Sequence, residues 1–432
     1  MNLAIPYGDN FATAGLEGVR CIGVLDVADI SQPPDLDSVI REAIEHPIGL
    51  KKNLYEIVSP GNTVTILVSD AFRHTGAEYF LPILVEGLNR ARIPDDAISF
   101  IFATGVHRPP AEDEKAHILG AAIYERFRAR AYAHDPRDDA NLVYIGTTSR
   151  GTPLRINRRA HDADILIATG TVVFHYFGGF GGGRKSVLPG IASVDAISHN
   201  HAMNLDPLED RLNPAVQIGL LDGNPVAEDM LEGARLAGVD YTINTILNRQ
   251  SRITAVFAGE LDAAHRAAAA RARDVFAVRI NEKADLVIAS AGSARNFVQS
   301  HKALYNAWLA VKPEGRIIFL TRCEEGLGGE SFAKWVRLGT REAVIAGLRR
   351  QSEINGQTAL STLERAPMTL FVTDMTEADV RMLGGRKAES LQQALDLARH
   401  DLAHLANPTV YVMPSASYTV PFLCPYYTEL HS

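Results

Sequence analysis

A glycine-rich segment between residues 173 and 201 contains the side chains with the clearest chemical potential. It reads VFHYFGGFGGGRKSVLPGIASVDAISHNH, and five of its glycines precede Arg184, Lys185 and Ser186. Glycine lets a backbone approach a ligand closely and present its N–H groups to an anion. A P-loop requires glycine directly before the lysine, where this chain has Arg184, and the dinucleotide pattern GxGxxG is absent from the segment. A standard nucleotide site is therefore disfavoured, which leaves another anion-binding loop or a flexible loop with solvated cations.

Three histidines flank these glycines. His175 precedes them, and His199 and His201 follow them. An isolated histidine is usually a structural residue of the surface or the core. Histidines beside a glycine loop that also carries a lysine instead indicate acid–base or metal chemistry.

Two expected strands end in further polar side chains. The run TVTILVS at 63–69 is followed by Asp70 and Arg73, and the run ISFIFA at 98–103 is followed by TGVHRP, which contains His107. Ligands of open α/β sheets bind at the carboxyl ends of strands, so Asp70, Arg73 and His107 should converge on one site. The alternatives are a helix N-cap for Asp70 and a surface ion pair for Arg73.

A third pair of polar residues follows a strand expected in the second half of the chain. Gln299 and Lys302 are three residues apart, which places them on one face of a helix. The face is either solvated or directed at an anion, and in the second case it would complete the site of Arg73 from another domain.

The composition is that of an ordinary folded chain of 432 residues, long enough for two domains. With 43 Lys and Arg against 51 Asp and Glu, the formal net charge is −8, which argues against a general nucleic-acid or anionic-membrane binder. Cys21, Cys323 and Cys424 form no CxxC pair, which excludes a zinc–thiolate site and suits a reducing compartment. Because neither a signal-peptide pattern nor a membrane-spanning stretch is present, we expect a cytoplasmic protein.

Short apolar runs alternate with amphipathic helical patterns, which predicts an α/β fold with mainly parallel sheets. The expected strands lie at 63–69, 98–103, 142–145 and 164–168, and then at 284–290, 316–320, 369–372 and 409–413. The expected helices lie at 36–45, 79–91, 263–277 and 390–397. The Ala-rich helix separates the two strand series, so we expect an N-terminal domain at 1–275, a C-terminal domain at 276–432 and an active-site cleft between them.

Taken together, these segments resemble the nickel-dependent lactate racemase family over most of the chain. The motifs that carry the resemblance are DxxR at 70–73, TGxHR at 104–108, HYFxGxxGGRK at 175–185, LPG at 188–190, NH at 200–201 and QxxK at 299–302. Their spacing is specific, since Lys185 lies ten residues after His175 and sixteen before His201.

The resemblance implies a nickel-pincer nucleotide, a pyridinium mononucleotide that holds nickel through two sulfurs and a ring carbon and is joined to the protein through a lysine thioamide. Lys185 would be the attachment lysine, and His201 would complete the square plane of the nickel, a geometry that suits Ni(II). No function falls to His199. The implied cofactor contacts are Lys185, Asp70, Arg184, Ser186, Gly190 and Lys302, with the glycine loop, Arg184 and Ser186 at the phosphate.

The reaction that the resemblance implies is racemisation or epimerisation at C2 of a 2-hydroxy acid. One histidine takes the hydroxyl proton while the C2 hydrogen moves as hydride to the cofactor, and return of the hydride to the other face inverts the centre. Inversion in both directions needs an acid–base group on either side, and His107 and His175 are the matching pair. Arg73, Gln299 and Lys302 would bind the substrate, Arg73 through its carboxylate.

The chain departs from the family pattern at two places that bear on the identity of the substrate. The chain has tryptophan only at positions 308 and 335, although some family members use a tryptophan further downstream, and position 298 is valine where a larger polar aromatic would suit lactate. A sugar acid, malate or an aromatic hydroxy acid is therefore an alternative to lactate.

Two other functions stay open, namely oxidation of a hydroxy acid without racemisation on the same scaffold, and binding of a carboxylate or nucleotide without catalysis. For the racemase, the expected partners are a small 2-hydroxy acid and the proteins that synthesise the cofactor and insert nickel. No nucleic-acid or membrane partner is expected.

Overall fold

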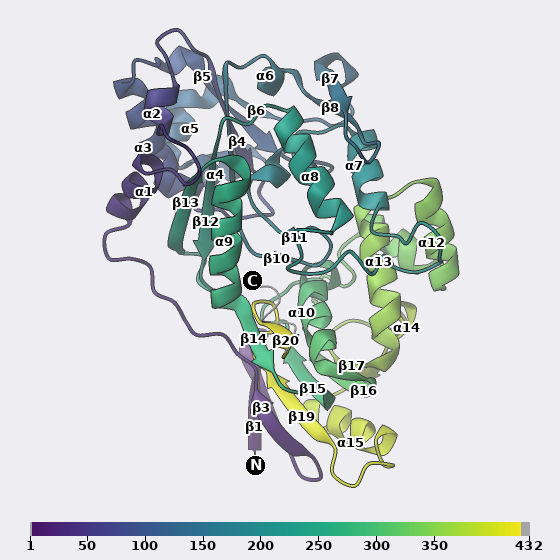
Figure 1. The fold of residues 1–432 in the computed structure, drawn as a ribbon. Helices are drawn as coiled ribbons and strands as arrows, with labels where there is room; N and C mark the ends of the chain where they lie inside the picture. Colours follow the sequence, from purple (N-terminus) through teal and green to yellow (C-terminus); the bar gives the residue numbers. More distant parts are fainter. Residues whose placement is uncertain (1, 425–432) are drawn as a thin grey trace. The chain divides into compact units, whose positions relative to one another are not determined.

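The computed structural model describes residues 2–424, which form two compact units (Figure 1). The N-terminal unit comprises Asp29–Pro207 and Leu212–Asp274. The C-terminal unit comprises the residues up to Ala28, the short segment Leu208–Arg211 and the residues from Val275 onward. Each unit contains one six-stranded sheet.

The sheet of the N-terminal unit is parallel except at one edge. Its strands are β4 (Val64–Ser69), β5 (Ile98–Ala103), β6 (Ala131–Ala133), β9 (Ile165–Thr171), β12 (Tyr241–Leu247) and β13 (Ile253–Gly259). Their order is β13-β12-β9-β4-β5-β6, and only β12 and β13 pair in antiparallel fashion. The central strands are apolar on both faces, as in sheets that are covered on both sides.

Helices cover one face of this sheet and enclose the core of the unit. They are α1 (Leu36–Glu45), α2 (Leu54–Ile57), α3 (Ala77–Arg90), α4 (Glu112–Leu119) and α5 (Ala121–Phe127). Ile66, Phe80 and Phe100 are fully buried in this core. Burial of such side chains contributes roughly 1.5–3 kcal/mol each, so this face holds the sheet and its strand ends rigidly.

The glycine-rich segment packs against the other face of the same sheet. It forms the short strands β10 (Phe174–His175) and β11 (Gly179–Phe180), followed by the 3-10 turn η4 (Gly183–Ser186), which contacts β9 and β12. The remaining helices of the unit are α6 (Arg158–His161), α7 (Val194–Ala202), α8 (Pro225–Leu236) and α9 (Leu261–Phe276). The strand expected at 142–145 is β7 (Leu142–Thr147), which pairs in antiparallel fashion with β8 (Pro153–Asn157) and lies outside the parallel sheet.

The C-terminal unit contains an entirely parallel sheet with the order β18-β17-β16-β15-β19-β3. Its strands are β3 (Arg20–Val24), β15 (Ala284–Ser290), β16 (Val311–Leu320), β17 (Thr369–Val372), β18 (Arg386–Ala388) and β19 (Thr409–Met413). Its helices are α10 (Phe297–Ala310), α11 (Glu330–Val336), α12 (Arg341–Arg350), α13 (Ile354–Arg365), α14 (Glu377–Leu383) and α15 (Leu391–Asp401). Two-stranded pairs are formed by β1 (Asn2–Tyr7) with β2 (Asn10–Gly15) and by β14 (Ala277–Ile280) with β20 (Val420–Leu423). The two largely parallel sheets confirm the predicted α/β class.

The grouping of the first 28 residues differs from the expected division at 275/276. These residues belong to the C-terminal unit because β3 pairs with β19 at the edge of its sheet, from Arg20 opposite Thr409 to Val24 opposite Val412. Short exposed patterns at a chain terminus carry little periodic signal, so the sequence analysis expected no strand in these residues and grouped them by position in the chain alone.

No helix between residues 2 and 424 is long and apolar enough to cross a bilayer.

Candidate functional site

Asp70 and His107 form a hydrogen-bonded pair at the carboxyl edge of the N-terminal sheet. Ser69 and Ala103, the last residues of the parallel strands β4 and β5, lie opposite each other, so the turns that follow them meet. His107 Nδ1 donates to Asp70 Oδ2 at 2.6 Å. The other oxygen of Asp70 accepts the Phe72 N–H at 3.0 Å, and the N-cap of α3 is Gly76, so Asp70 caps this turn rather than a helix.

The turn that carries His107 is anchored to the loop that follows Lys185. Gly105 N–H donates to Gly190 O at 2.9 Å, and Gly190 N–H donates to Lys185 O at 2.9 Å. A Cβ atom on Gly190 would collide with the Ser186 backbone. Gly190 therefore connects the His107 turn to the lysine loop through its backbone, and only glycine permits that packing.

Phe177 brings together three of the residues that the sequence singled out. Its ring is 1% exposed, and its centroid lies 4.4 Å from that of His175 and 4.9 Å from that of His201. Lys185 Nζ lies 5.3 Å from the same centroid. The hairpin of β10 and β11 positions His175, whose Nδ1 accepts the Gly178 N–H at 3.2 Å.

Lys185 is held in surroundings that favour its neutral amine. Burial lowers the pKa of Lys185 well below its usual value, and the positive charges of Arg73 and Arg184 lower it further. A neutral amine is a nucleophile, whereas an ammonium group is not. The site therefore suits a lysine that forms a covalent bond through Nζ.

His201 is neutral and presents its Nε2 lone pair. It is 1% exposed on α7, and its Nδ1 donates to Ile197 O at 2.8 Å, which places the proton on Nδ1. Burial lowers the pKa of His201 to about 4, and a proton on the neighbouring Lys185 would lower it in the same direction. Metal ligation requires neutral imidazole with a fixed tautomer, and His201 meets both conditions. His199 is exposed instead, and its Nε2 lies 3.2 Å from Arg150 O.

The loop glycines approach the protein's own sheet. A Cβ on Gly183 would collide with Thr242 Oγ1, and a Cβ on Gly181 would lie 2.8 Å from Thr171 O. Their N–H groups are also used internally, since Gly183 N–H donates to Asn244 Oδ1 at 2.8 Å and Gly181 N–H donates to Val173 O at 2.8 Å. The N–H groups of Gly181 and Gly183 are therefore used within the chain, and a phosphate contact of the glycine loop stays a prediction.

Arg184 and Ser186 are likewise bound to the backbone. Arg184 is 2% exposed and donates to Gly178 O at 3.1 Å and Ala227 O at 3.2 Å. Burial lowers the pKa of Arg184 to about 10. Ser186 Oγ donates to Thr169 O at 2.6 Å. These contacts give both residues a structural function, and the phosphate contact expected of them stays a prediction.

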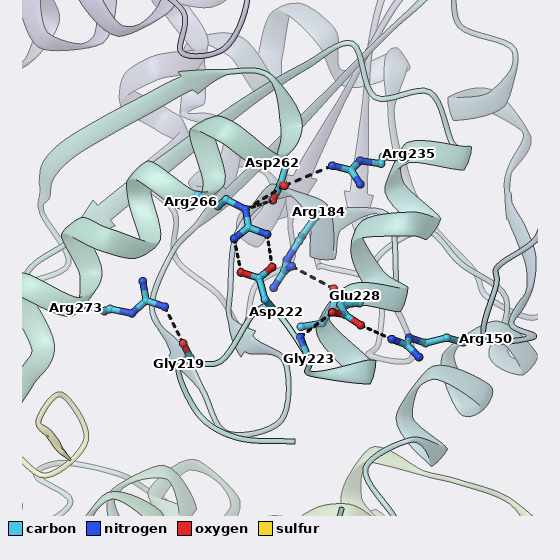
Figure 2. A network of polar contacts seen from close by, with 11 residues as sticks. Arg150, Arg184, Gly219, Asp222, Gly223, Glu228, Arg235, Asp262, Arg266 and Arg273 are labelled. Atoms are coloured by element: carbon cyan, nitrogen blue, oxygen red, sulfur yellow. Dashed lines mark hydrogen bonds and ion pairs between the residues drawn. The ribbon is translucent and has the colours of Figure 1, made fainter. Parts of the chain in front are cut away.

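An ion-pair network fastens the loop between α7 and α8 to helix α9 (Figure 2). Arg266 binds both oxygens of Asp222 at 2.6 and 2.8 Å and also pairs with Asp262 on its own helix. Arg273 donates to Gly219 O at 2.9 Å, which adds a second attachment. Arg184 lies close to this network, since the charges of Asp262, Arg266 and Asp222 act on its pKa.

The predicted substrate-binding residues are divided between the units. Arg73 is exposed, follows Asp70 in the same turn and is close enough to lower the pKa of Lys185. Gln299 and Lys302 lie in the first turns of α10 in the C-terminal unit, where Gln299 Oε1 accepts the Arg295 N–H at 3.1 Å. Joint binding of one substrate by Arg73, Gln299 and Lys302 therefore stays a prediction, as does the cleft.

Two aromatic residues belong to this site although the sequence analysis gave them no function. Phe177 is one, and its place in the HYF motif was the available signal. Phe72 is the other, with a ring that is 57% exposed and 4.9 Å from the His107 ring. An exposed phenylalanine beside a histidine–carboxylate pair offers an apolar surface to a ligand.

The side chains of this site could bind a metal ion only if an organic group supplied most of its ligands. Among residues 2–424, no group of three or more His, Cys, Asp or Glu side chains could hold a metal ion. His201 offers one nitrogen and Lys185 a neutral amine on the same side of the sheet, around Phe177. A nickel ion bound here would therefore need most of its ligands from an organic group, and His201 and Lys185 suit such a group.

The open, mainly parallel sheet, with a histidine–carboxylate pair and a lysine of lowered pKa near its strand ends, defines an α/β protein whose candidate active site lies at the carboxyl edge of the sheet. The chain belongs to the lactate racemase family, since residues 7–211 match the lactate racemase N-terminal domain and residues 280–417 match the lactate racemase C-terminal domain.

Characterised relatives support this assignment. The chain is 32% identical to the lactate racemase of Thermoanaerobacterium thermosaccharolyticum over 341 residues, 78% of either chain, and 32% identical to that of Lactiplantibacillus plantarum over 333 residues, 76% of either chain. The structure of the Thermoanaerobacterium lactate racemase apoprotein matches 98% of this chain with a TM-score of 0.86 and 28% identity, and covers 100% of that chain. A Thermotoga maritima protein shares the fold, with a TM-score of 0.64 at 17% identity over 92% of this chain and 100% of that chain.

Proposed function

We propose that this protein racemises or epimerises the hydroxyl-bearing C2 of a 2-hydroxy acid with a nickel-pincer nucleotide attached to Lys185. Membership of the lactate racemase family supports the reaction class. The observation that carries the proposal is the arrangement of His175, Lys185 and His201 around Phe177, beside a lysine loop that is hydrogen-bonded to the His107 turn.

In this proposal the cofactor, when bound, accepts the C2 hydrogen as hydride and returns it. The chain itself binds and orients the substrate and moves the hydroxyl proton. Arg73 binds the substrate carboxylate through its planar guanidinium. His107 receives the hydroxyl proton at Nε2, and Asp70 stabilises the imidazolium that forms. His175 contacts the substrate oxygen once the substrate has turned so that the other face of C2 receives the hydride.

Lys185 and His201 hold the cofactor in this scheme. The depressed pKa of Lys185 keeps the amine unprotonated for attachment. His201 supplies the single nitrogen ligand from the protein, with the Nδ1 proton directed at Ile197 O. The nearby Phe177 ring excludes water from one side of both groups.

The proposal is tested with protein produced together with the cofactor-synthesis and nickel-insertion proteins. We expect one nickel per chain, a mass increment on the peptide that contains Lys185, and inversion of chiral 2-hydroxy acids. Lys185→Arg should lose the increment and the activity, whereas Lys115→Arg, on the surface helix α4, should keep both. Turnover without nickel or without the increment would contradict the proposal.

The same assay separates the alternative functions. Lactate, malate, a sugar acid and an aromatic hydroxy acid are each incubated as single enantiomers. Formation of the opposite enantiomer without lasting keto acid supports racemisation. Accumulation of keto acid would identify an oxidoreductase, and binding without turnover by the loaded protein would identify a binding protein.

A further inference from the structure

The two candidate acid–base histidines differ in which ring nitrogen carries the proton. His107 Nδ1 lies 2.6 Å from a carboxylate oxygen of Asp70, which can only accept a hydrogen bond when ionised. The proton of neutral His107 therefore resides on Nδ1. Its Nε2 has a free lone pair in that tautomer and can accept a proton.

His175 has the opposite arrangement. Its Nδ1 accepts the backbone N–H of Gly178 at 3.2 Å, and a backbone N–H can only donate. The proton of neutral His175 therefore resides on Nε2. Protonation of Nδ1 would place two N–H groups against each other, so the Gly178 amide opposes both the other tautomer and the imidazolium.

We propose that the Gly178 amide locks His175 as an Nε2–H donor in the resting enzyme, so that His107 alone is ready to act as a base. With respect to catalysis, this inference rests on the proposed function. The substrate enantiomer whose hydroxyl faces His107 reacts directly from the resting state. The other enantiomer reacts only after His175 has given up the Gly178 hydrogen bond and moved its proton to Nδ1.

The proton balance distinguishes the two histidines. In the direct case, His107 Nε2 takes the hydroxyl proton and becomes imidazolium, while His175 Nε2–H donates a hydrogen bond to the carbonyl oxygen of the keto acid. When the inverted hydroxy acid forms, its C2 oxygen takes the Nε2 proton of His175, the Gly178 hydrogen bond is given up as solvent supplies a proton to His175 Nδ1, and His107 returns its proton to solvent. In the other case, His175 needs a free Nε2, so its proton must first pass through solvent to Nδ1.

The tautomers are measured without cofactor or turnover. Long-range ¹H–¹⁵N correlation spectra of the full-length chain with labelled histidine, recorded at about pH 8.5, separate protonated from unprotonated ring nitrogens, since histidine is ordinarily neutral there. We expect protonated Nδ1 for His107 and protonated Nε2 for His175, assigned with His107→Gln and His175→Gln. The internal control is His134, whose Nε2 lies 3.0 Å from Ala192 O and whose Nδ1 lies 3.3 Å from Asn157 Nδ2. The same tautomer for His107 and His175, or an imidazolium at His175, would overturn the proposal.

A second measurement uses the loaded enzyme. Keto acid formed in the first turnover is quenched and quantified for each enantiomer of an active substrate. We expect the two first-turnover rates to differ by about three- to tenfold, the effect of giving up one hydrogen bond. The ratio kcat/KM must stay equal for the enantiomers because racemisation has an equilibrium constant of one. Equal first-turnover rates would contradict the lock even if the protein is a racemase.

Two variants of Gly178 complete the test. Gly178→Ala keeps the N–H, and its Cβ would lie at ordinary distances of 3.5 Å from His175 Nδ1 and 3.6 Å from Lys185 Nζ, so the tautomer should be unchanged. Gly178→Pro removes the N–H and should allow protonated Nδ1 at His175. If Gly178→Pro does not fold, the spectrum of the unaltered chain still decides the proposal.

Discussion

His107 Nδ1 donates to Asp70 Oδ2 at 2.6 Å, and the accepting carboxylate is only 4% exposed. The pair spans two turns that follow adjacent parallel strands, so the sheet itself sets their separation. A buried carboxylate at this distance fixes both the orientation and the tautomer of an imidazole. This relationship gives the first prediction.

Asp70→Asn should lower kcat by about 10²- to 10⁴-fold while the fold is retained. The asparagine amide can donate to Nδ1, which moves the imidazole proton to Nε2 and removes the base. Steady-state kinetics and circular dichroism measure the two effects. Asp37→Asn, at an exposed position of α1, is the control and should leave kcat within about twofold. An unchanged kcat in Asp70→Asn would argue against His107 as the base.

Lys185 should react with amine-specific reagents at a pH where ordinary lysines are protonated. Its pKa is lowered by burial and by the charges of Arg73 and Arg184, so a larger fraction of its amine is neutral at about pH 8. Arg73→Ala removes one positive charge, raises the pKa of Lys185 and should slow labelling severalfold. Competitive labelling with mass spectrometry gives the rates relative to Lys115, which Arg73→Ala should not affect.

Phe72→Ala should change substrate preference more than overall activity. The exposed ring beside His107 would cover an apolar or aromatic side chain on C3 of the substrate. We expect kcat/KM for an aromatic 2-hydroxy acid to fall about tenfold more than that for lactate. Equal losses for both substrates would mean that Phe72 acts only by supporting His107.

Gly183→Ala should destabilise the N-terminal unit by about 1–3 kcal/mol, because the added Cβ collides with Thr242 Oγ1 on β12. The matched variant Gly178→Ala meets its neighbours at 3.5 Å or more and should cost less than about 1 kcal/mol. Urea unfolding of the two variants gives the comparison. A Gly183→Ala chain as stable as Gly178→Ala would show that the loop does not pack on the sheet this closely.

Acid should destabilise the C-terminal unit through His301. Burial and the charge of Arg365 lower the pKa of His301 from 6.5 to about 3. Between these values the unfolded chain binds a proton that the folded chain does not, so stability falls as the pH drops from 6.5 towards 3. The loss from His301 at pH 5 is about 2 kcal/mol.

Urea unfolding at pH 7 and pH 5 checks this value. His301→Gln should lose less stability than the unaltered chain on acidification, by about that amount. His199→Gln, at an exposed position, should behave like the unaltered chain. If the free energy of unfolding of His301→Gln depended on pH as that of the unaltered chain does, His301 would not be the source of the acid destabilisation.

The hydrophobic pattern of the sequence located the strand ends of the site correctly. Buried strands leave periodic apolar runs, and their carboxyl ends meet at one edge, so Asp70 and His107 were expected near each other and are hydrogen-bonded. The strand expected at 142–145 is present, but its antiparallel pairing with β8 could not be predicted, because periodicity identifies a strand and not its partner. The grouping of the residues up to Ala28 with the C-terminal unit could not be predicted for the same reason, since β3 pairs with β19 near the other end of the chain.

The sequence by itself determined the α/β class, the family motifs and the residue types at the strand ends, because these depend on local periodicity and spacing. Only the tertiary structure decided what the glycines, Arg184 and Ser186 contact. A glycine that packs on a strand and a glycine that cradles a phosphate have the same local sequence. The packing of β9, β12 and the loop decides which backbone or ligand approaches these glycines. That packing joins residues that are far apart in the sequence, such as Thr242, whose Oγ1 donates to the O of Ala168, 74 positions earlier.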